Sequence, residues 1–239
     1  MYKCMKFNQV LFLLGALLIC GCASTGNKKT EPSYTFLFPH DMSEWSCSNY
    51  LSYLKSNHQN LYGELKEVLK KRPHKFLEQA DLKFLKPLSI EYVPDKKKAR
   101  PSYFVMVHKT AIHDLIQLVQ AASRAGYDLR VQSAFRSVPI QNYLWQSAVR
   151  TAENDHQVAA FKTAPPCYSE HATGKSVDFS LADTEAKIAE NDVYPWLLKN
   201  ASKYGWIQSF PAGAKHTTKD PDKPGLLLEE WHFKHKSLN

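Results

Sequence analysis

The sequence predicts an α+β protein with a helical extension ahead of its main domain. Segments with a helical spacing of apolar residues and segments with strand-like alternation are intermixed along the 239 residues. They follow no regular βαβ rhythm, which argues against a doubly wound parallel sheet. The hydrophobic content of 44% with only 9 glycines is typical of a globular protein, and the length suffices for a sizeable core.

The first 22 residues have the features of an export signal. Lys3 and Lys6 precede the apolar stretch VLFLLGALLICGCA, which gives a charged start and a hydrophobic core. The stretch ends in Ile-Cys-Gly-Cys and resembles the bacterial lipobox, so that Cys22 would carry the acyl chains. An uncleaved single-pass anchor is the alternative, although the apolar run is short for a span of about 20 residues. Both interpretations place the domain outside the cytoplasm, with residues 23–46 as a polar tether.

Two cysteines remain after export and could form a disulfide. With Cys22 bound to lipid and the signal removed, Cys47 and Cys167 are left in an oxidising environment. They either form one disulfide or stay free and buried, and we favour the disulfide.

The net charge of the chain says little about its binding partners. A net charge of +8 suits an acidic partner, but the lysines are spread widely. The sequence has no nucleic-acid motif and no basic helix with interleaved aromatic residues, so we do not expect nucleic-acid binding. We expect a monomer.

Residues 47–84 are expected to form the helical extension. Their leucines recur at helical spacing, which indicates one or two amphipathic helices packing on the main domain. Residues 84–107 carry prolines with β-branched and aromatic residues, which favours extended segments joined by a charged loop.

The middle of the chain alternates between helix and strand patterns. Residues 112–125 carry one apolar stripe, and Gly126 stands where a helix C-terminus favours glycine. Alternation over residues 127–135 predicts a half-buried strand. Ser137 followed by Pro139 predicts the start of a helix that continues to about residue 149.

The C-terminal third supplies the remaining strands. Val177 and Phe179 alternate with polar residues, so a strand here would bury both and place Asp178 on the opposite face. A helix is expected to end at Gly205. Strands are expected over 206–210 and 226–235, with a loop over 211–225 between them.

Two separated segments carry the residues of a candidate metal site. SEHATGKSVD (169–178) holds His171 and Asp178, and EEWHF (229–233) holds His232 beside two glutamates. A catalytic zinc site takes three protein ligands and leaves a fourth position for water. A glutamate not bound to the metal could take the proton from that water. Taken singly, these residues are as well explained by a satisfied structural histidine and a hydrogen-bonded strand carboxylate.

Together the segments resemble the zinc D-alanyl-D-alanine carboxypeptidases of the VanY type, in the group that includes lysostaphin and the hedgehog-like peptidases. SEHATGKSVD matches the family pattern S-x-H-x-x-G-x-A-x-D, with Ser176 where alanine is usual. EEWH matches E-x-W-H, and SAFRS (133–137) matches a serine-aromatic-arginine-serine segment. The resemblance covers about residues 85–236, with the three motifs in the family's order.

The resemblance implies a zinc peptidase domain over residues 85–239, built on a small central, mainly antiparallel sheet flanked by helices. It implies that His171, Asp178 and His232 bind the ion and that Glu229 is the general base and acid. Arg136 would bind the polarised carbonyl or the terminal carboxylate of the peptide, because its planar fork can meet two oxygens. The expected substrate-binding residues are Ser133, Ser137, Gln141, Ser169 and Trp231.

The choice of base depends on the local backbone. Strict strand alternation places Glu230, and not Glu229, on the face of His232. The family spacing selects Glu229. We follow the family spacing, which requires a loop or a bulge to break the alternation at Glu229.

Three positions depart from the family pattern. Cys167 stands where glycine is usual, and a disulfide to Cys47 would pin the extension beside the site. His235 takes a place often held by an aromatic residue, and Glu230 replaces a common proline. His235 and His216 are each expected to be solvated, because they lie in or next to polar C-terminal segments.

The sequence therefore predicts an exported, lipid-anchored zinc carboxypeptidase that removes the terminal D-alanine from peptidoglycan stem peptides. The alternatives on the same scaffold are an L,D-carboxypeptidase, a D,D-dipeptidase and a cross-link endopeptidase. A catalytically silent wall-binding lipoprotein is the alternative from another class.

Overall fold

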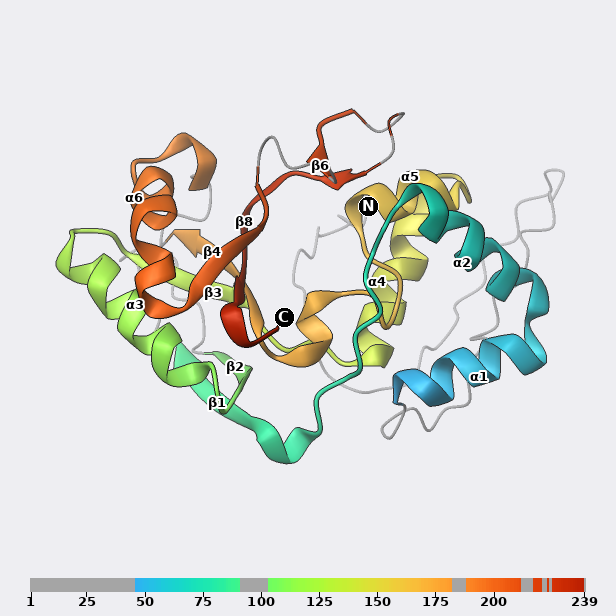
Figure 1. The fold of residues 1–239 in the computed structure, drawn as a ribbon, viewed down its shortest axis with the longest axis horizontal. Helices are drawn as coiled ribbons and strands as arrows, with labels where there is room; N and C mark the ends of the chain where they lie inside the picture. The colour runs from blue at the N-terminus through green and yellow to red at the C-terminus, as the bar shows by residue number, and fades with distance from the viewer. Residues whose placement is uncertain are drawn as a thin grey trace, which may run out of the picture. The chain divides into compact units, whose positions relative to one another are not determined.

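The computed structural model describes residues 46–90, 103–181, 188–211, 217–220, 223 and 225–238. The predicted signal, Cys22 and the tether up to residue 45 lie outside the described residues, as does His216. None of the described helices combines the length and the apolarity needed to cross a bilayer. The described chain mixes helices with a small antiparallel sheet, as predicted (Figure 1).

The central sheet has four strands in the order β3-β4-β8-β5, and every neighbouring pair is antiparallel. Its strands are β3 (Leu129–Ser133), β4 (Ser176–Leu181), β8 (Glu229–His235) and β5 (Trp206–Phe210). Val177 and Phe179 are fully buried, and Asp178 between them points to the other face. The prediction for this strand is confirmed.

Two helices cover one face of the sheet. They are α3 (Ile112–Arg124) and α6 (Val193–Asn200), and both appear at the left of Figure 1 near β3 and β4. Leu115 and Leu197 of these helices share one buried cluster with Phe179 and Phe233 of the sheet. Hydrophobic burial on this face therefore fixes which face of β4 and β8 is left for polar side chains.

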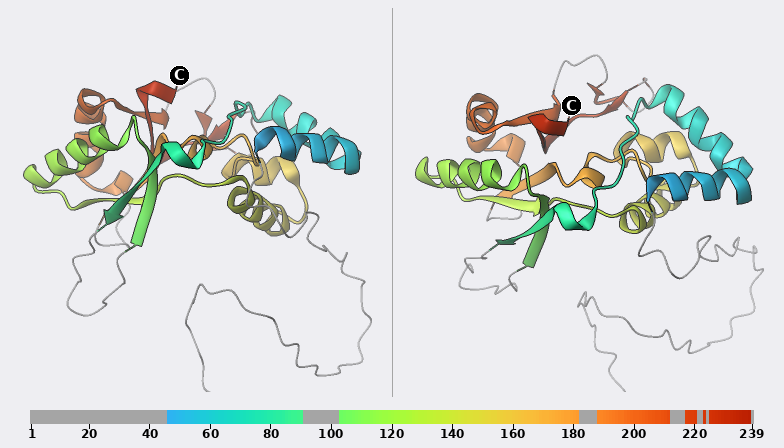
Figure 2. Two further views of the ribbon diagram at one scale, coloured as in Figure 1. Left: turned by 90° about the horizontal axis from the view of Figure 1, so that it is seen from below. Right: turned by 60° about the horizontal axis from the view of Figure 1, so that its bottom comes forward.

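Four helices form a second group. They are α1 (Cys47–Asn57), α2 (Gln59–Lys71), α4 (Val138–Thr151) and α5 (His156–Lys162), which gather at one end of the described chain in both views of Figure 2. Val68 of α2 packs with Trp145 and Val149 of α4 and with Ala160 of α5. The extension thus contains the predicted helices and packs on the main domain, whereas α5 was not predicted.

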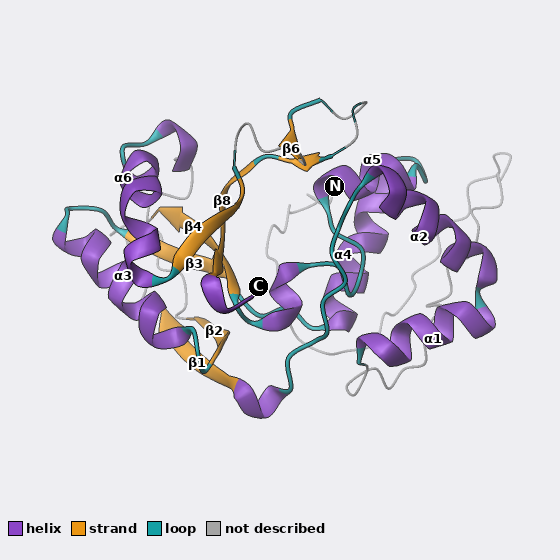
Figure 3. Cartoon of the chain, viewed as in Figure 1, coloured by secondary structure: helices purple, strands orange, loops and turns teal. Residues whose placement is uncertain are grey.

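Two small sheets and several short helices complete the fold (Figure 3). β1 (Leu85–Ile90) pairs antiparallel with β2 (Tyr103–His108), and β6 (Thr217–Thr218) pairs parallel with β7 (Leu226–Leu227). The 3-10 helices are η1 (Leu82–Phe84), η2 (Glu170–Thr173), η3 (Ile188–Glu190), η4 (Ala201–Tyr204) and η5 (Lys236–Leu238). The single last strand predicted over 226–235 is divided into β7 and β8.

The pairing between β5 and β8 is irregular near Glu229. The assignment of Glu229 as the base requires such a break in strand alternation at this position. Gln208 pairs with Phe233, but Phe210 pairs with Glu229 where regular pairing would bring residue 231. Three residues of β8 (230–232) thus lie opposite the single residue Ser209 of β5, so two residues are extra. They break the strict alternation between Glu229 and His232.

His235 corrects one prediction. We expected a solvated side chain, but His235 is buried because β8 is an inner strand with β4 and β5 on its two sides. Its Nε2 lies 2.9 Å from Asp114 Oδ2, and its Nδ1 lies 2.8 Å from Ser237 Oγ. These contacts satisfy both ring nitrogens and tie the end of β8 to α3.

Candidate active site

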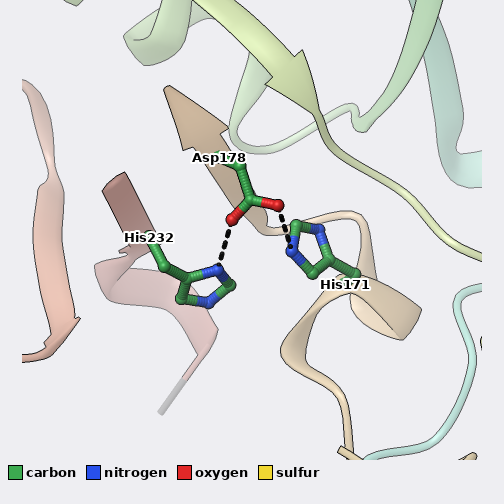
Figure 4. Close-up of side chains that lie close together, drawn as sticks. All are labelled: His171, Asp178 and His232. Atoms are coloured by element: carbon green, nitrogen blue, oxygen red, sulfur yellow. Dashed lines mark hydrogen bonds and ion pairs between the residues drawn. The ribbon is translucent and has the colours of Figure 1, made fainter. Parts of the chain in front are cut away.

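Three side chains that could bind a metal converge on the polar face of the sheet. Asp178 and His232 are paired across β4 and β8, and His171 comes from η2 just ahead of β4. The Asp178 carboxylate lies between the two imidazoles, with Oδ2 3.1 Å from His171 Nε2 and Oδ1 2.8 Å from His232 Nδ1 (Figure 4). One ligand atom from each residue lies within 4.8 Å of the other two.

Gly174 allows the chain to turn from His171 into β4. Its φ of +65° lies in the left-handed region, which glycine adopts without strain. A Cβ at this position would lie 2.6 Å from Leu85 Cδ2 and 3.1 Å from His108 N. Both the backbone angle and the close approach of β1 and β2 therefore require glycine here.

Each histidine directs one nitrogen at the cluster and holds the other in a separate hydrogen bond. His171 Nδ1 lies 2.6 Å from the Ala134 carbonyl oxygen, and His232 Nε2 lies 3.0 Å from Glu170 Oε2. Metal-binding histidines are oriented in this way, since the outer hydrogen bond fixes the tautomer. With Asp178 they form a donor set of two imidazoles and one carboxylate, which suits zinc. The residues present thus fit a catalytic zinc ion.

The protonation of the cluster follows from burial and pairing. Burial lowers the pKa of His171, which favours the neutral ring that a metal requires. Burial opposes charge on His232 as well, but hydrogen bonds to Asp178 and Glu170 outweigh it and raise the pKa of His232 to about 10. His171 and His232 together overcome the burial of Asp178 and hold its pKa below the usual range.

Glu229 lies beside this cluster without joining it. Its Oε2 is 3.9 Å from His232 Nδ1, and its side chain lines the adjoining cavity. Burial raises the pKa of Glu229 to about 7. A general base and acid is most effective with a pKa near the working pH, so Glu229 has the environment that the predicted role demands.

Arg136 is held in place by two residues that the sequence analysis assigned to the substrate. It donates from Nη1 to Gln141 Oε1 (2.9 Å) and from Nη2 to Ser133 Oγ (3.1 Å). The same Nη2 lies 3.6 Å from Asp178 Oδ2. Gln141 is buried and donates in turn to the Ala164 carbonyl oxygen. Gln141 and Ser133 therefore orient the guanidinium.

A cavity of about 510 Å³ opens beside the cluster and contains most of the predicted site residues. This volume is typical of small-ligand sites. The predicted residues that line it are Arg136, Gln141, Ser169, His171, Asp178, Glu229, Trp231 and His232. Ser133 and Ser137 are not among the described residues that line it. Ser137 instead precedes α4 as its N-cap, and its carbonyl oxygen accepts from Gln141 N–H.

Two further residues of the cavity were not singled out from the sequence. Glu170 stands between two motif residues, and its carboxylate also accepts from Ser209 Oγ and from Lys234 Nζ. His74 comes from the extension, and its Nε2 lies 2.9 Å from the Ala160 carbonyl oxygen. Glu170 could have been predicted as a site residue from its position inside the SEHATGKSVD motif. No local sequence pattern around His74 predicts that it lines the cavity.

Cys47 and Cys167 are joined by a disulfide with a Cα–Cα distance of 5.4 Å. Cys167 has a φ of +70°, in the left-handed region that favours glycine. This backbone geometry explains why the family usually has glycine at this position. The disulfide ties the first helix of the extension to the segment that leads into His171.

Comparison with known proteins places these residues in a family. The family described as VanY, D-alanyl-D-alanine carboxypeptidase, matches residues 105–237. The chain belongs to this family. The matched residues include the whole metal cluster, Arg136 and Glu229, and they exclude the extension.

Two curated proteins each match about half of the chain. YodJ of Bacillus subtilis (strain 168), classed by inference as a carboxypeptidase, is 27% identical over 135 residues, which cover 54% of this chain and 46% of YodJ. A D-alanyl-D-alanine carboxypeptidase of Enterococcus faecium is 25% identical over 135 residues, covering 56% and 39%. The chain thus spans less than half of the length of these two relatives. The structure of the LdcB LD-carboxypeptidase has the same fold, with a TM-score of 0.50 at 24% identity over 64% of this chain and 67% of that chain.

Proposed function

We propose that the protein is a zinc-dependent carboxypeptidase that removes the terminal D-alanine from peptidoglycan stem peptides. The observation that carries the proposal is the convergence of His171, Asp178 and His232, with the outer nitrogen of each imidazole already hydrogen-bonded. Membership of the VanY family supports the reaction class and the substrate.

The catalytic roles follow from position and charge. Zinc, held by His171, Asp178 and His232, would supply the Lewis acidity that lowers the pKa of water to about 7 and polarises the scissile carbonyl. Arg136 faces the same cavity and offers a permanent positive charge to the terminal carboxylate or to the polarised carbonyl oxygen. Its two hydrogen bonds to Ser133 and Gln141 hold the guanidinium in one orientation, which lowers the entropy cost of binding.

Glu229 performs the proton transfer. Its carboxylate accepts a proton from the water that attacks the carbonyl carbon, and a C–O bond forms. The C–N bond then breaks, and Glu229 returns the proton to the nitrogen of the departing D-alanine. Burial raises the pKa of Glu229 above its usual value, which favours a group that must accept and release one proton.

The location outside the cytoplasm is part of the proposal. The charged and apolar N-terminus with Cys22 supports export and a lipid anchor. The Cys47–Cys167 disulfide supports it independently, because disulfides persist in oxidising compartments. An anchored enzyme would stay within reach of the cell wall.

Defined stem peptides test the reaction. The protein is incubated with a pentapeptide ending in D-Ala-D-Ala, with the tetrapeptide and with the free dipeptide, and the products are identified by mass. We expect one D-alanine to be released from the pentapeptide only. Release from the tetrapeptide alone would replace the proposal by an L,D-carboxypeptidase, and cleavage of the dipeptide would indicate a D,D-dipeptidase. Muropeptide binding without any cleavage would indicate a silent wall-binding protein.

A further inference from the structure

Glu170 has a position in the site that its place between Ser169 and His171 does not by itself explain. Its side chain is 15% exposed and turns toward β5 and β8, away from the segment that carries it. Oε2 accepts from Ser209 Oγ and from His232 Nε2, and Oε1 lies 3.2 Å from Lys234 Nζ. Three contacts from two strands therefore fix one carboxylate.

The contact between Glu170 and His232 connects this carboxylate to the metal cluster. The Nδ1 of His232 faces Asp178 Oδ1 at 2.8 Å, and its Nε2 faces Glu170 Oε2 at 3.0 Å. A neutral imidazole that offers Nδ1 to a metal must carry its proton on Nε2. Glu170 supplies the acceptor that this tautomer needs.

The two histidines of the cluster are held differently. His171 has a backbone carbonyl as its outer acceptor, and that carbonyl belongs to Ala134 beside β3. His232 has a charged side chain, anchored by Ser209 and Lys234. A carboxylate is the stronger acceptor and makes the ring a better donor to a metal.

We infer that Glu170 is a positioning residue of the metal centre, which fixes the tautomer and orientation of His232 through the Nε2–H to Oε2 hydrogen bond. This inference rests on the proposed zinc site and adds to it the residue that prepares one ligand. Ser209 and Lys234 act one step further out, because they hold the carboxylate and do not touch the imidazole.

The zinc dissociation constant of variant proteins tests the inference without relying on activity. Zinc is titrated against a chromogenic chelator, with the metal-free thermal stability of each variant measured beside it. We expect Glu170→Ala to bind zinc about 10- to 100-fold more weakly. Glu170→Gln should lose less, since its side-chain oxygen can still accept from Nε2–H. Ser209→Ala should lose least, because it keeps the carboxylate.

The matched control is Glu230→Gln, which removes one negative charge two residues from His232 on the same strand. We expect zinc affinity close to that of the wild type. Equal weakening by Glu230→Gln and Glu170→Gln would show a through-space charge effect and would overturn the inference. Wild-type affinity in folded Glu170→Ala would overturn it as well.

Histidine nitrogen resonances give a direct reading of the tautomer. In zinc-loaded wild type, ¹⁵N-labelled His232 should carry its proton on Nε2, and that proton should exchange faster in Glu170→Ala. An Nδ1-protonated His232 in the wild type would contradict the inference. If the wild type binds no zinc, the proposed function fails and this inference fails with it. If the wild type binds zinc and releases D-alanine while Glu170→Ala binds zinc equally well, the inference alone fails.

Discussion

The extension (residues 47–84) and the family-matched region (residues 105–237) contribute to the active site in different ways. Every described residue to which we assign chemistry comes from the matched region. The extension contacts the backbone around those residues: Leu77 N–H donates to the Cys167 carbonyl oxygen, and Ala80 N–H donates to that of Ala172. These two hydrogen bonds bracket the segment that carries His171. The extension therefore supports the segment that carries His171 from outside, without supplying a reacting group.

Arg72 makes a second link between the extension and the matched region. Its fully buried guanidinium donates to the carbonyl oxygens of Gln157, Lys223 and Gly225 and lies over the ring of Phe161. Gly225 N–H donates back to the Lys71 carbonyl oxygen. The extension thus ties α5, which lines the cavity, to the residues just ahead of β7.

The comparison predicts that changes to the reacting groups lower the rate without unfolding the protein. We expect the largest effect from Glu229→Gln, which keeps the size of the side chain but cannot accept the proton. The rate of D-alanine release should fall about 10²- to 10⁴-fold. Steady-state kinetics and thermal unfolding, measured on the same preparation, check both halves of this expectation.

Glu230→Gln is the matched control for that variant. It removes the same charge one residue away, and we expect the rate to stay near that of the wild type. The assignment would be contradicted if Glu230→Gln lost the activity and Glu229→Gln kept it.

Loss of the disulfide that ties the extension to the matched region should have the opposite effect. The disulfide closes a loop with a sequence separation of 120 residues, so the double variant Cys47→Ala/Cys167→Ala should lose about 4 kcal/mol of unfolding free energy. Denaturant unfolding measures this loss. The rate per folded molecule should change little, because neither cysteine touches the reacting atoms.

A second double variant sharpens this test. Cys47→Ala/Cys167→Gly lacks the same disulfide but has a residue that adopts the φ of +70° without strain. It should recover about 1 kcal/mol relative to the double alanine variant. Equal stability of the two would show that the backbone of residue 167 relaxes once the disulfide is absent.

Acid should destabilise the protein through the extension. Burial lowers the pKa of His74 from 6.5 to about 4, so the ring is neutral in the folded protein at pH 6 while the unfolded chain takes up a proton. Stability should therefore be unaffected by His74 above pH 6.5 and fall by about 3 kcal/mol between pH 6.5 and 4.

The comparison of wild type with His74→Gln isolates this contribution. Both proteins are unfolded with denaturant from pH 7.5 to 4, without metal. The difference in unfolding free energy should shift in favour of His74→Gln as the pH falls. A difference that does not vary with pH would show that His74 takes up its proton in the folded protein.

The smallest effect is expected within the matched region, at the position where the family usually has alanine. Ser176 is fully buried, and its hydroxyl has no hydrogen-bond partner among the described residues. Ser176→Ala should therefore stabilise the protein by about 1 kcal/mol. Ser180→Ala, on the same strand but half-buried, should change stability less. Destabilisation by Ser176→Ala would indicate that the hydroxyl is satisfied.

The sequence could predict the site residues of the matched region because spacing within a motif reflects local geometry. His171 lies in the short 3-10 helix η2 and Asp178 in β4, and only the turn at Gly174 separates these two elements, all within ten residues. The break in alternation at Glu229 followed from setting the motif against strand geometry. The strand over Val177 and Phe179 followed from its alternation alone.

Contacts between distant segments could not be predicted in the same way. The bond from Arg72 to Gly225 joins residues 153 positions apart, and no local pattern marks either end. His235 was misjudged because its polar neighbours gave no sign that β8 would lie between two other strands. The start of α5 was missed although Asp155 caps it by accepting from two backbone N–H groups, since the helix is only 7 residues long.

Release of D-alanine from the pentapeptide, before and after removal of metal by a chelator and after addition of zinc, tests the central claim most directly. The account predicts release that the chelator abolishes and zinc restores, and no restoration in a His171→Ala variant. Release that persists in the chelator-treated, metal-free protein would contradict it, because His171, Asp178 and His232 would then not be the ligands of a catalytic ion.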